Sequence, residues 1–325
     1  MHAPLLLISL LTTMPVASPI QKFGVPRIVR FSEGAKSAVS LQFDDSMTTQ
    51  LANAIPLLNE RHLRATFFIN PGRPQHQAHL HEWEFSVPMA KHELANHTLN
   101  HIGAKDAAEA EREIGACSAV LRKIYGDKPR LMSFGQPGGV PWAVTPAQLA
   151  PIFAKYRLIP SVNRVFFDEK TTDPVSIVQR SLDRKEWLQL GMHGTGGEWL
   201  STSIPTLTKL FDFLVAHRPE VWVAPTIEVY KYVHERDAAK TPVLKPSGSG
   251  FSISVDCDPA KLETFGLPVQ ALYDQPLTVE VPVPADWQKV RVRQGRMTYV
   301  YETKGGSVLL NVLPNVGAAK VDKLN

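Results

Sequence analysis

Two adjacent carboxylates stand at the end of an apolar stretch, where Phe43 is followed by Asp44, Asp45 and Ser46. Residues 38–43 have the composition of a short strand, and successive side chains at a strand end point in different directions. One carboxylate can therefore bind a metal ion while the other stays free as a general base. The pair also fits a simple helix N-cap, because Asp often accepts backbone hydrogen bonds at that position.

A pair of histidines follows a second strand-like stretch, residues 93–96. His97 and His101 lie four residues apart, a spacing that places two imidazoles on one face of a helical turn. Together with one Asp they leave open coordination positions for water and substrate. Two histidines with this spacing and no other motif also occur by coincidence on protein surfaces. Asn96 begins a formal glycosylation sequon, which we discount because a glycan there would crowd the metal site.

Two later strand ends carry glycines. Residues 134–139 (FGQPGG) end a predicted strand, and a backbone N–H near Gly138 can face a reacting oxygen there. An ordinary turn of Gly and Pro has the same composition. His193 ends the predicted strand 187–192 and enters the glycine-rich loop 194–197. A single His is usually a core residue, but this context exposes His193.

The order of these motifs resembles the polysaccharide deacetylases, the NodB-homology or carbohydrate esterase family 4 group. The motifs are FDD, HTLNH about fifty residues later, FGQPG at a strand end, and MH at a late strand end. The resemblance spans about residues 25–237 and implies a distorted (β/α) barrel with one divalent metal ion, usually Zn²⁺. It implies these roles: metal ligands Asp45, His97 and His101, catalytic base Asp44 and general acid His193.

The third motif departs from the family pattern. Members often carry there an Arg that tethers the base, whereas alignment on Phe134 and Pro137 places Gly135 at that position. Arg164 and Arg130 are candidates to replace it, and the sequence does not choose between them. A fourth motif that would orient His193 is not recognisable, and its candidates are Asp168, Asp173 and Asp183.

The histidines of residues 75–82 and two tryptophans could each have a functional or a purely structural role. The polar stretch 75–82 contains three His and one Glu, which favours a solvated loop over a second metal site. Trp142 and Trp199 each follow a proposed active-site loop. Their rings could stack on sugars, although core packing is the alternative for both.

The elements that must position these residues alternate between strand and helix over residues 25–238. Strands are predicted at 38–43, 65–70, 93–96, 131–136, 158–162, 187–192 and 221–224. Helices are predicted at 48–63, 106–125, 145–156, 205–217 and 226–236. Such alternation predicts parallel strands with helices outside, as a barrel or an open sheet. In either case the chemistry belongs at the carboxyl ends of the strands.

The pattern changes after residue 238. Residues 240–250 (KTPVLKPSGSG) have the composition of a linker. Alternating runs follow at 251–255, 277–283, 289–292, 297–301 and 307–312, and they predict a small β-sandwich domain over 245–318. Residues 318–325 are expected to form a loose tail. The sandwich could bind glycan, but we favour a packing module that braces the barrel.

The composition excludes several classes. The 325 residues are 44% hydrophobic and 20% charged, which excludes disorder over most of the chain. The formal charge of +4 is scattered, which favours a solvated surface over nucleic-acid binding. Cys117 and Cys257 are interpreted as isolated buried thiols, with a disulfide as the alternative.

The first residues indicate export. Residues 5–14 form an apolar run, followed by Pro15, Val16, Ala17 and Ser18, which suits signal-peptidase cleavage. We predict a signal peptide over 1–18 and a secreted or periplasmic protein, with an uncleaved leader as the alternative. Ten apolar residues are too few for a membrane span, which needs about 20, and no other segment is long enough.

The leading hypothesis is a metal-dependent hydrolase that removes N-acetyl or O-acetyl groups from a carbohydrate. It implies one divalent metal ion, Zn²⁺ first, and an acetylated glycan as partner, without nucleic acid. Two alternatives remain. The same fold could cleave another C–N bond in a small or cyclic amide, since the third motif is altered. The chain could also be a non-catalytic glycan-binding protein.

Overall fold

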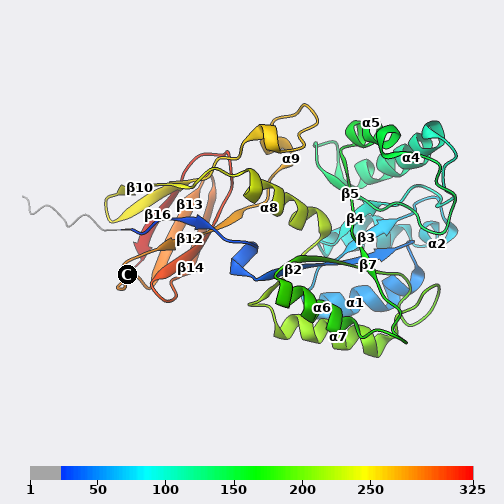
Figure 1. Ribbon diagram of the computed structural model, residues 1–325, viewed down its shortest axis with the longest axis horizontal. Helices are drawn as coiled ribbons and strands as arrows, with labels where there is room; N and C mark the ends of the chain where they lie inside the picture. Colours follow the sequence, from blue (N-terminus) through cyan, green and yellow to red (C-terminus); the bar gives the residue numbers. More distant parts are fainter. Residues whose placement is uncertain (1–22, 325) are drawn as a thin grey trace, which may run out of the picture.

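The computed structural model describes residues 23–324, so the signal peptide predicted at 1–18 lies outside the described residues. Two units lie side by side in Figure 1, a sheet of parallel strands with helices around it and a smaller all-β unit. Helix α8 (Thr226–Ala238) lies between them. Within the described part of the chain, no helix is both long and apolar enough to cross a membrane.

The larger unit is built on eight strands, all paired in parallel. Their order is β6-β5-β4-β3-β2-β8-β7, and β9 pairs with β2 as well. The strands are β2 (Ser37–Asp44), β3 (Thr66–Ile69), β4 (Glu93–Asn96), β5 (Met132–Phe134), β6 (Leu158–Pro160), β7 (Val165–Phe166), β8 (Trp187–Met192) and β9 (Val221–Val223). The strands predicted in this region are therefore present, and β7 is an addition.

The sheet curls into a distorted barrel. Strands β6 and β7 lie at opposite ends of the strand order, yet only residues 161–164 connect them. Because a chain spans at most about 3.5 Å per residue, this connection brings the two edges together. The Gln189 amide closes the gap by donating to the Val162 carbonyl at 2.8 Å, and its oxygen accepts from Ser161 Oγ at 2.5 Å. Side chains thus replace strand pairing at the seam.

Helices cover the outside of the barrel. They include α1 (Ile55–Glu60) after the π-turn η2 (Gln50–Ala54), α4 (Ala107–Tyr125), α5 (Pro146–Tyr156), α6 (Pro174–Arg184) and α7 (Ile204–Ala216). Short pieces form α2 (Pro74–Gln77), η3 (Glu82–Ser86) and α3 (Val87–Met89). Helix α4 begins where Asp106 accepts from the Glu109 N–H, and a capping box of Thr145 and Gln148 begins α5. Helix α6 is absent from the sequence prediction, although Asp173 caps it.

The two faces of the sheet differ in polarity. In β2, Val39, Leu41 and Phe43 belong to the large apolar cluster that the helices cover. The alternate residue Gln42 faces inward, and its amide donates to Ser161, Gln189 and Thr226 at 2.8–3.0 Å. The barrel interior is therefore filled by hydrogen-bonded polar side chains, which hold the strand ends in place.

The smaller unit is a sandwich of two antiparallel sheets. One has the order β1-β12-β15 and the other β10-β11-β16-β13-β14. The strands are β1 (Arg27–Ile28), β10 (Val243–Ser247), β11 (Gly250–Ser254), β12 (Leu277–Pro282), β13 (Lys289–Gln294), β14 (Met297–Glu302), β15 (Ser307–Val312) and β16 (Ala319–Leu324). The five predicted strands correspond to β11–β15, and the short η4 (Pro259–Lys261) and α9 (Val269–Leu272) interrupt them.

Three strands lie outside the expected range 245–318, wholly or in part. Strand β10 occupies the predicted linker, where Pro246 is tolerated because β10 is an edge strand. The expectation of a loose tail at 318–325 is wrong for Ala319–Leu324, because Ala319 and Val321 are buried and β16 pairs with β11 and β13. Strand β1 reaches the sandwich from the start of the described chain (Figure 1).

The sandwich packs against the barrel through α8. Leu131 and Ile159 of the barrel belong to the same apolar cluster as Tyr232 of α8 and the sandwich core. The Tyr232 hydroxyl donates to the Val29 carbonyl at 3.0 Å, which ties α8 to the segment after β1. These contacts agree with a module that braces the barrel.

Replacing Glu235 with Gln should stabilise the protein increasingly as the pH rises. Glu235 is fully buried in α8, and burial raises its pKa well above 4.5 despite the nearby Lys231. The unfolded chain ionises at this position near pH 4.5, at a lower pH than the folded chain does, so the wild type loses stability as the pH rises toward the raised pKa of the folded state. We expect similar midpoints of thermal unfolding at pH 4, and at pH 8 a midpoint a few degrees higher for Glu235→Gln.

The matched control is Glu302→Gln, which changes an exposed carboxylate of β14. A difference between Glu235→Gln and wild type that stays the same at both pH values would contradict a neutral Glu235 in the folded protein.

Candidate active site

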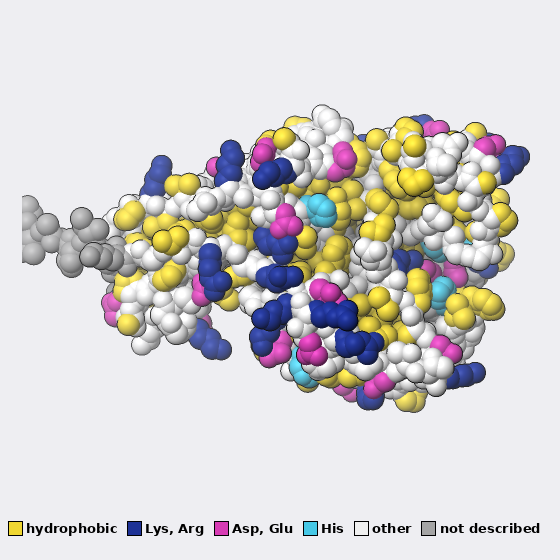
Figure 2. All heavy atoms as spheres, viewed as in Figure 1, with side chains coloured by type: hydrophobic (Ala, Val, Ile, Leu, Met, Phe, Trp, Pro, Cys, Tyr) yellow, Lys and Arg dark blue, Asp and Glu magenta, His cyan; other side chains and the backbone are white. Residues whose placement is uncertain are grey.

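A cavity of about 930 Å³ opens at the carboxyl ends of the barrel strands. Its lining contains the predicted residues Asp44, Asp45, His97, His101, Gly138, His193 and Trp199. Figure 2 shows the hollow on the barrel unit, with His, acidic and basic side chains gathered inside it. Trp142 does not line the cavity and packs against the barrel core. The fold thus brings together all but one of the predicted site residues.

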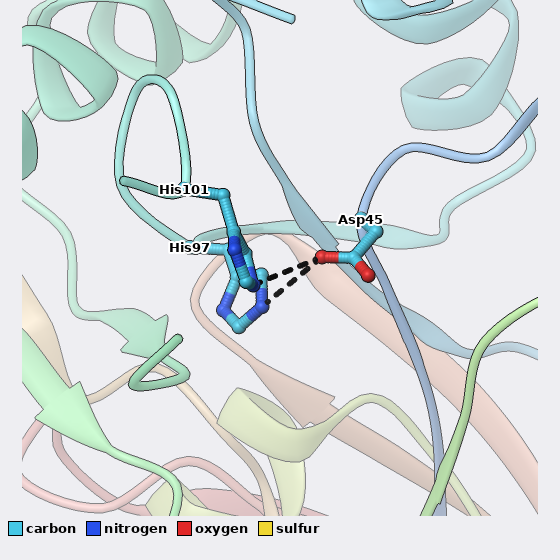
Figure 3. A group of neighbouring side chains, drawn as sticks. All are labelled: Asp45, His97 and His101. Carbon is cyan, nitrogen blue, oxygen red and sulfur yellow. Dashed lines mark ion pairs between the residues drawn. The ribbon is translucent and has the colours of Figure 1, made fainter. Parts of the chain in front are cut away.

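Asp45, His97 and His101 form one cluster (Figure 3). Asp45 Oδ1 lies 3.5 Å from His97 Nε2 and 3.3 Å from His101 Nε2. This oxygen is buried and has no hydrogen-bond partner. A carboxylate oxygen and two imidazole nitrogens within 4.8 Å of one another fit a divalent cation of the zinc type. No other such cluster occurs in residues 23–324.

Electrostatics within the cluster support the same assignment. Burial acts to raise the pKa of Asp45, but the imidazoles of His97 and His101 outweigh it and hold this pKa below its usual value. Burial lowers the pKa of His101, and Asp45 opposes that shift only in part. Both pKa shifts are in the direction that favours metal binding, because a metal ion binds an ionised carboxylate and a neutral imidazole.

The two histidines lie on a loop, so the predicted helical turn is wrong. The Asn96 side chain accepts from the Thr98 N–H at 2.9 Å directly after β4, which starts a turn instead of a helix. Thr98 and His101 have φ of 67° and 58°. The Asn70 amide donates to the carbonyls of His97 and Thr98 at 2.5 and 3.1 Å. Because its own amide donates to α4, Asn96 is unsuited to carry a glycan.

Gly135 orients His97 and explains the altered third motif. Its carbonyl lies 2.7 Å from His97 Nδ1, which leaves Nε2 free to face the cavity. A Cβ at residue 135 would lie 2.9 Å from Phe68 Cδ1 and 3.2 Å from His97 Nδ1. The position therefore has no room for the Arg that the family pattern often places there.

Arg164 makes the contact with Asp44, the predicted base, that no side chain at Gly135 can make. Its Nη2 lies 2.5 Å from Asp44 Oδ1, and its Nε donates to Gln42 at 2.6 Å. The guanidinium lies over the rings of Phe68 and Phe166 at 4.6 and 4.8 Å, and the side chain is only 9% exposed. Arg164 ends the connection that closes the barrel, so the chain supplies it from the seam between β6 and β7.

Arg130, the other candidate, lies elsewhere. It stacks over the Tyr125 ring at 4.4 Å and donates to the Tyr125 carbonyl.

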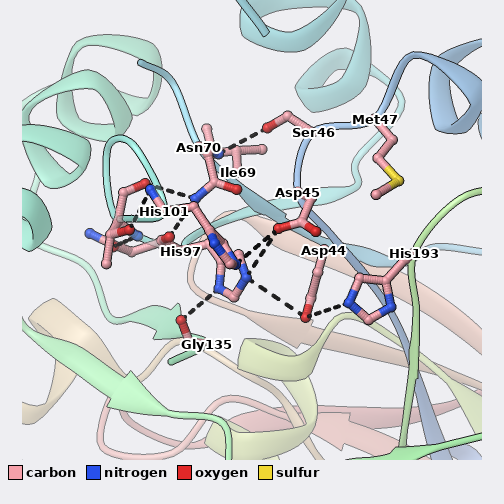
Figure 4. A network of polar contacts seen from close by, with 12 residues as sticks. Asp44, Asp45, Ser46, Met47, Ile69, Asn70, His97, His101, Gly135 and His193 are labelled. Carbon is pink, nitrogen blue, oxygen red and sulfur yellow. Dashed lines mark hydrogen bonds and ion pairs between the residues drawn. The ribbon is translucent and has the colours of Figure 1, made fainter. Parts of the chain in front are cut away.

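His193 completes the group around Asp44 (Figure 4). Its Nε2 lies 3.9 Å from Asp44 Oδ2, and Gln50 holds its backbone by donating to the His193 carbonyl at 3.0 Å. Burial lowers the pKa of His193, while Asp44 and Asp45 act against that shift. The proposed orienting carboxylates bond elsewhere: Asp168 to Lys170, Asp173 to Val175 and Lys209, and Asp183 to Gln179.

The stretch 75–82 supports the metal cluster, and the expected solvated loop is wrong for His76. His76 is fully buried, stacks on Trp83, and has Nδ1 3.2 Å from Ser46 Oγ. Burial lowers its pKa to about 4, so the ring is neutral. Gln75 donates to the Asp45 carbonyl at 3.3 Å. Asp45 and Ser46 have φ of 78° and 51°, a strained turn that these contacts hold.

Trp199 lies at the rim of the cavity. It is 67% exposed, and the neighbouring Leu200 is 60% exposed. Glu198 fixes this loop by accepting from the Thr49 N–H at 2.6 Å. A rigid loop that presents an exposed ring suits contact with a sugar face.

The family model described as polysaccharide deacetylase matches residues 32–148. The match covers just over a third of the chain, so this part of the barrel unit is similar to the polysaccharide deacetylases. The matched segment contains Asp44, Asp45, His97, His101 and Gly135, whereas Arg164 and His193 follow it. No curated protein sequence matches the chain.

Solved structures resemble the barrel unit in part. A family 4 carbohydrate esterase from Streptomyces lividans, in complex with acetate, is 23% identical over 57% of this chain and 91% of that chain, with a TM-score of 0.44. Peptidoglycan deacetylase PdaC from Bacillus subtilis is 18% identical over 62% and 93%, with a TM-score of 0.45. A mutant of BA3943 from Bacillus anthracis, a pseudoenzyme with restored enzymatic activity, is 19% identical over 62% and 70%, with a TM-score of 0.45.

Proposed function

We propose that this protein is a metal-dependent hydrolase that removes N-acetyl groups, or O-acetyl groups, from a carbohydrate. The observation that carries the proposal is the convergence of Asp44, His193 and the metal-ligand cluster in one cavity. They come from the ends of β2, β4 and β8, which are far apart in the sequence. The match of residues 32–148 to the polysaccharide deacetylase family model supports the same reaction class.

Asp45, His97 and His101 would hold one divalent cation, with Zn²⁺ as our first choice. The cation would supply Lewis-acid polarisation of the acetyl carbonyl and of the attacking water. The unpartnered oxygen of Asp45 and the outward Nε2 of His97 are the features of this chain that suit such an ion.

The other residues have separate tasks. Asp44 accepts the proton that water loses as it attacks the acetyl carbon, and Arg164 holds the carboxylate in place. His193 donates a proton to the sugar nitrogen or oxygen as its bond to the acetyl carbon breaks, which releases acetate. A backbone N–H near Gly138, which lines the cavity, would stabilise the oxyanion. Trp199 offers a ring face to the sugar.

The remaining parts of the proposal concern organisation. We propose a catalytic domain over about 25–238 with an accessory β-sandwich, and a secreted or periplasmic location based on the apolar run at 5–14. The alternative of a small or cyclic amide substrate rests on the missing Arg of the third motif. Arg164 supplies that contact, which favours the carbohydrate substrate.

The test is acetate release from a panel of N-acetylglucosamine oligomers, peptidoglycan, acetylated xylan and a small acetyl ester. Wild type with zinc should release acetate, whereas chelated wild type and Asp44→Asn should lose at least about 99% of the rate. Asp183→Asn, which removes an exposed carboxylate outside the cavity, is the matched control and should keep full rate. Stoichiometric zinc without acetate release from any substrate would contradict the proposed reaction.

A further inference from the structure

Arg73 brings a second guanidinium to the cavity. It lines the same space as Asp44, Asp45 and the three histidines. It is close enough to His101 for its positive charge to act on that imidazole. The side chain is partly exposed, as expected of a group at the cavity wall. The mechanism above assigns this residue no task.

The backbone of Arg73 is fixed to the loop that carries the histidines. The neighbouring Gly72 N–H donates to the Leu99 carbonyl at 2.8 Å, and the Arg73 N–H donates to the Asn70 carbonyl at 3.1 Å. A Cβ at residue 72 would lie 2.1 Å from Asn100 Oδ1, so only Gly permits this close packing. The guanidinium therefore extends from a rigid base beside the metal cluster.

The charges in the cavity leave Arg73 without a partner. Asp44 and Asp45 are the carboxylates in its lining. Asp44 pairs with Arg164, and Asp45 is directed at His97 and His101. Within residues 23–324 the Arg73 guanidinium has neither an ion pair nor a hydrogen bond. Since burying part of an unpaired cation costs free energy, an external anion is its natural complement.

We propose that Arg73 binds an oxyanion on the substrate, a carboxylate or a phosphate carried by a sugar near the acetylated one. This inference rests on the proposed function and narrows it to acidic acetylated glycans. A guanidinium suits this role because its planar fork of N–H groups matches an oxyanion in a bidentate way. The neutral side chain of Gln136 and the amide oxygen of Asn100, both in the same lining, can serve the sugar hydroxyls.

The kinetic test compares three N-acetylated oligosaccharides of equal length: one with a sugar carboxylate, one with a sugar phosphate, and the carboxyl-reduced form of the first. For Arg73→Gln we expect KM to rise about tenfold to a hundredfold on an acidic oligosaccharide, with kcat and the neutral substrate little changed. Arg73→Lys keeps the charge without the fork and should lie between. Arg291→Gln, which removes an exposed charge on the sandwich, is the matched control.

A binding measurement separates this inference from the proposed function. Calorimetric titration of the chelated full chain with each oligosaccharide needs no turnover. We expect an acidic oligosaccharide to bind wild type more tightly than the neutral one does. This affinity should fall in Arg73→Gln and fall with added salt. That result would support the role of Arg73 even if no acetate were released. The acidic oligosaccharide whose affinity falls in Arg73→Gln, the carboxylate or the phosphate form, identifies the anion. If Arg73→Gln weakened the binding of acidic and neutral oligosaccharides equally, or changed neither affinity, the proposed role of Arg73 would be overturned.

Discussion

Asp45→Asn should lose the metal ion and, with it, acetyl release. The side chain of Asp45 supplies the one anionic ligand of the cluster, and its free oxygen is already aimed at two imidazoles. Loss of a residue that only orients a ligand typically weakens metal binding by 10–100-fold, so we expect removal of a ligand charge to exceed about 100-fold. Asn is the better substitute than Ala because Asp45 has φ of 78°, a conformation that Asn tolerates.

The measurement is zinc per chain after dialysis at a fixed free zinc concentration, together with acetate release. Wild type should hold one equivalent and Asp45→Asn almost none. Asp168→Asn is the control, because Asp168 bonds only within its own loop. A full equivalent of zinc in Asp45→Asn would show that the ligands are assigned wrongly.

Arg164→Gln should reduce kcat by about 100-fold or more while zinc binding stays intact. Arg164 contacts Asp44 and Gln42 but none of the three proposed metal ligands. It therefore acts by positioning the base, and general base catalysis is typically worth 10²–10⁴ in rate. KM should change little, because the proposed task of Arg164 is to hold Asp44 and not the sugar.

The control for this variant is Arg130→Gln, which removes the other candidate guanidinium away from the cavity. Because Arg164→Gln leaves a buried carboxylate unpaired, it also costs stability, of order 3–5 kcal/mol. Arg164→Lys keeps a positive charge beside Asp44. It tests the positioning role of Arg164 if Arg164→Gln does not fold. Folded Arg164→Lys and Arg164→Gln proteins with wild-type kcat would exclude a positioning role.

Local patterns in the sequence were sufficient to predict most of the barrel strands and the meeting of Asp45, His97 and His101. The alternation of strands and helices predicts β2–β6, β8 and β9, because parallel strands under helices leave a strong local pattern. Asp44, Asp45, His97 and His193 follow directly after such strands or end them. Since carboxyl ends of parallel strands meet at one edge, strand ends alone predict that these residues converge.

In two places, hydrogen bonds and packing gave a local structure that differs from the one the sequence predicts. The spacing of His97 and His101 suggests a helical turn, but the Asn96 and Asn70 side chains capture the backbone and form a loop. His76 belongs to a stretch whose polar composition suggests solvent exposure. The fold instead buries it against Ser46 and Trp83, which composition cannot reveal.

Only the tertiary structure decided which residue contacts Asp44, the proposed base. Arg164 and Asp44 are 120 residues apart in the sequence, and the contact exists because the barrel closes at the connection between β6 and β7. The same holds for β1 and β16, whose short segments acquire strand structure only by pairing within the sandwich. A motif records the chemistry carried by consecutive residues, whereas closure of a sheet depends on contacts across the whole fold. That is why the sequence was sufficient to propose Asp44, Asp45, His97 and His101, whereas the contact of Arg164 with Asp44 became evident only in three dimensions.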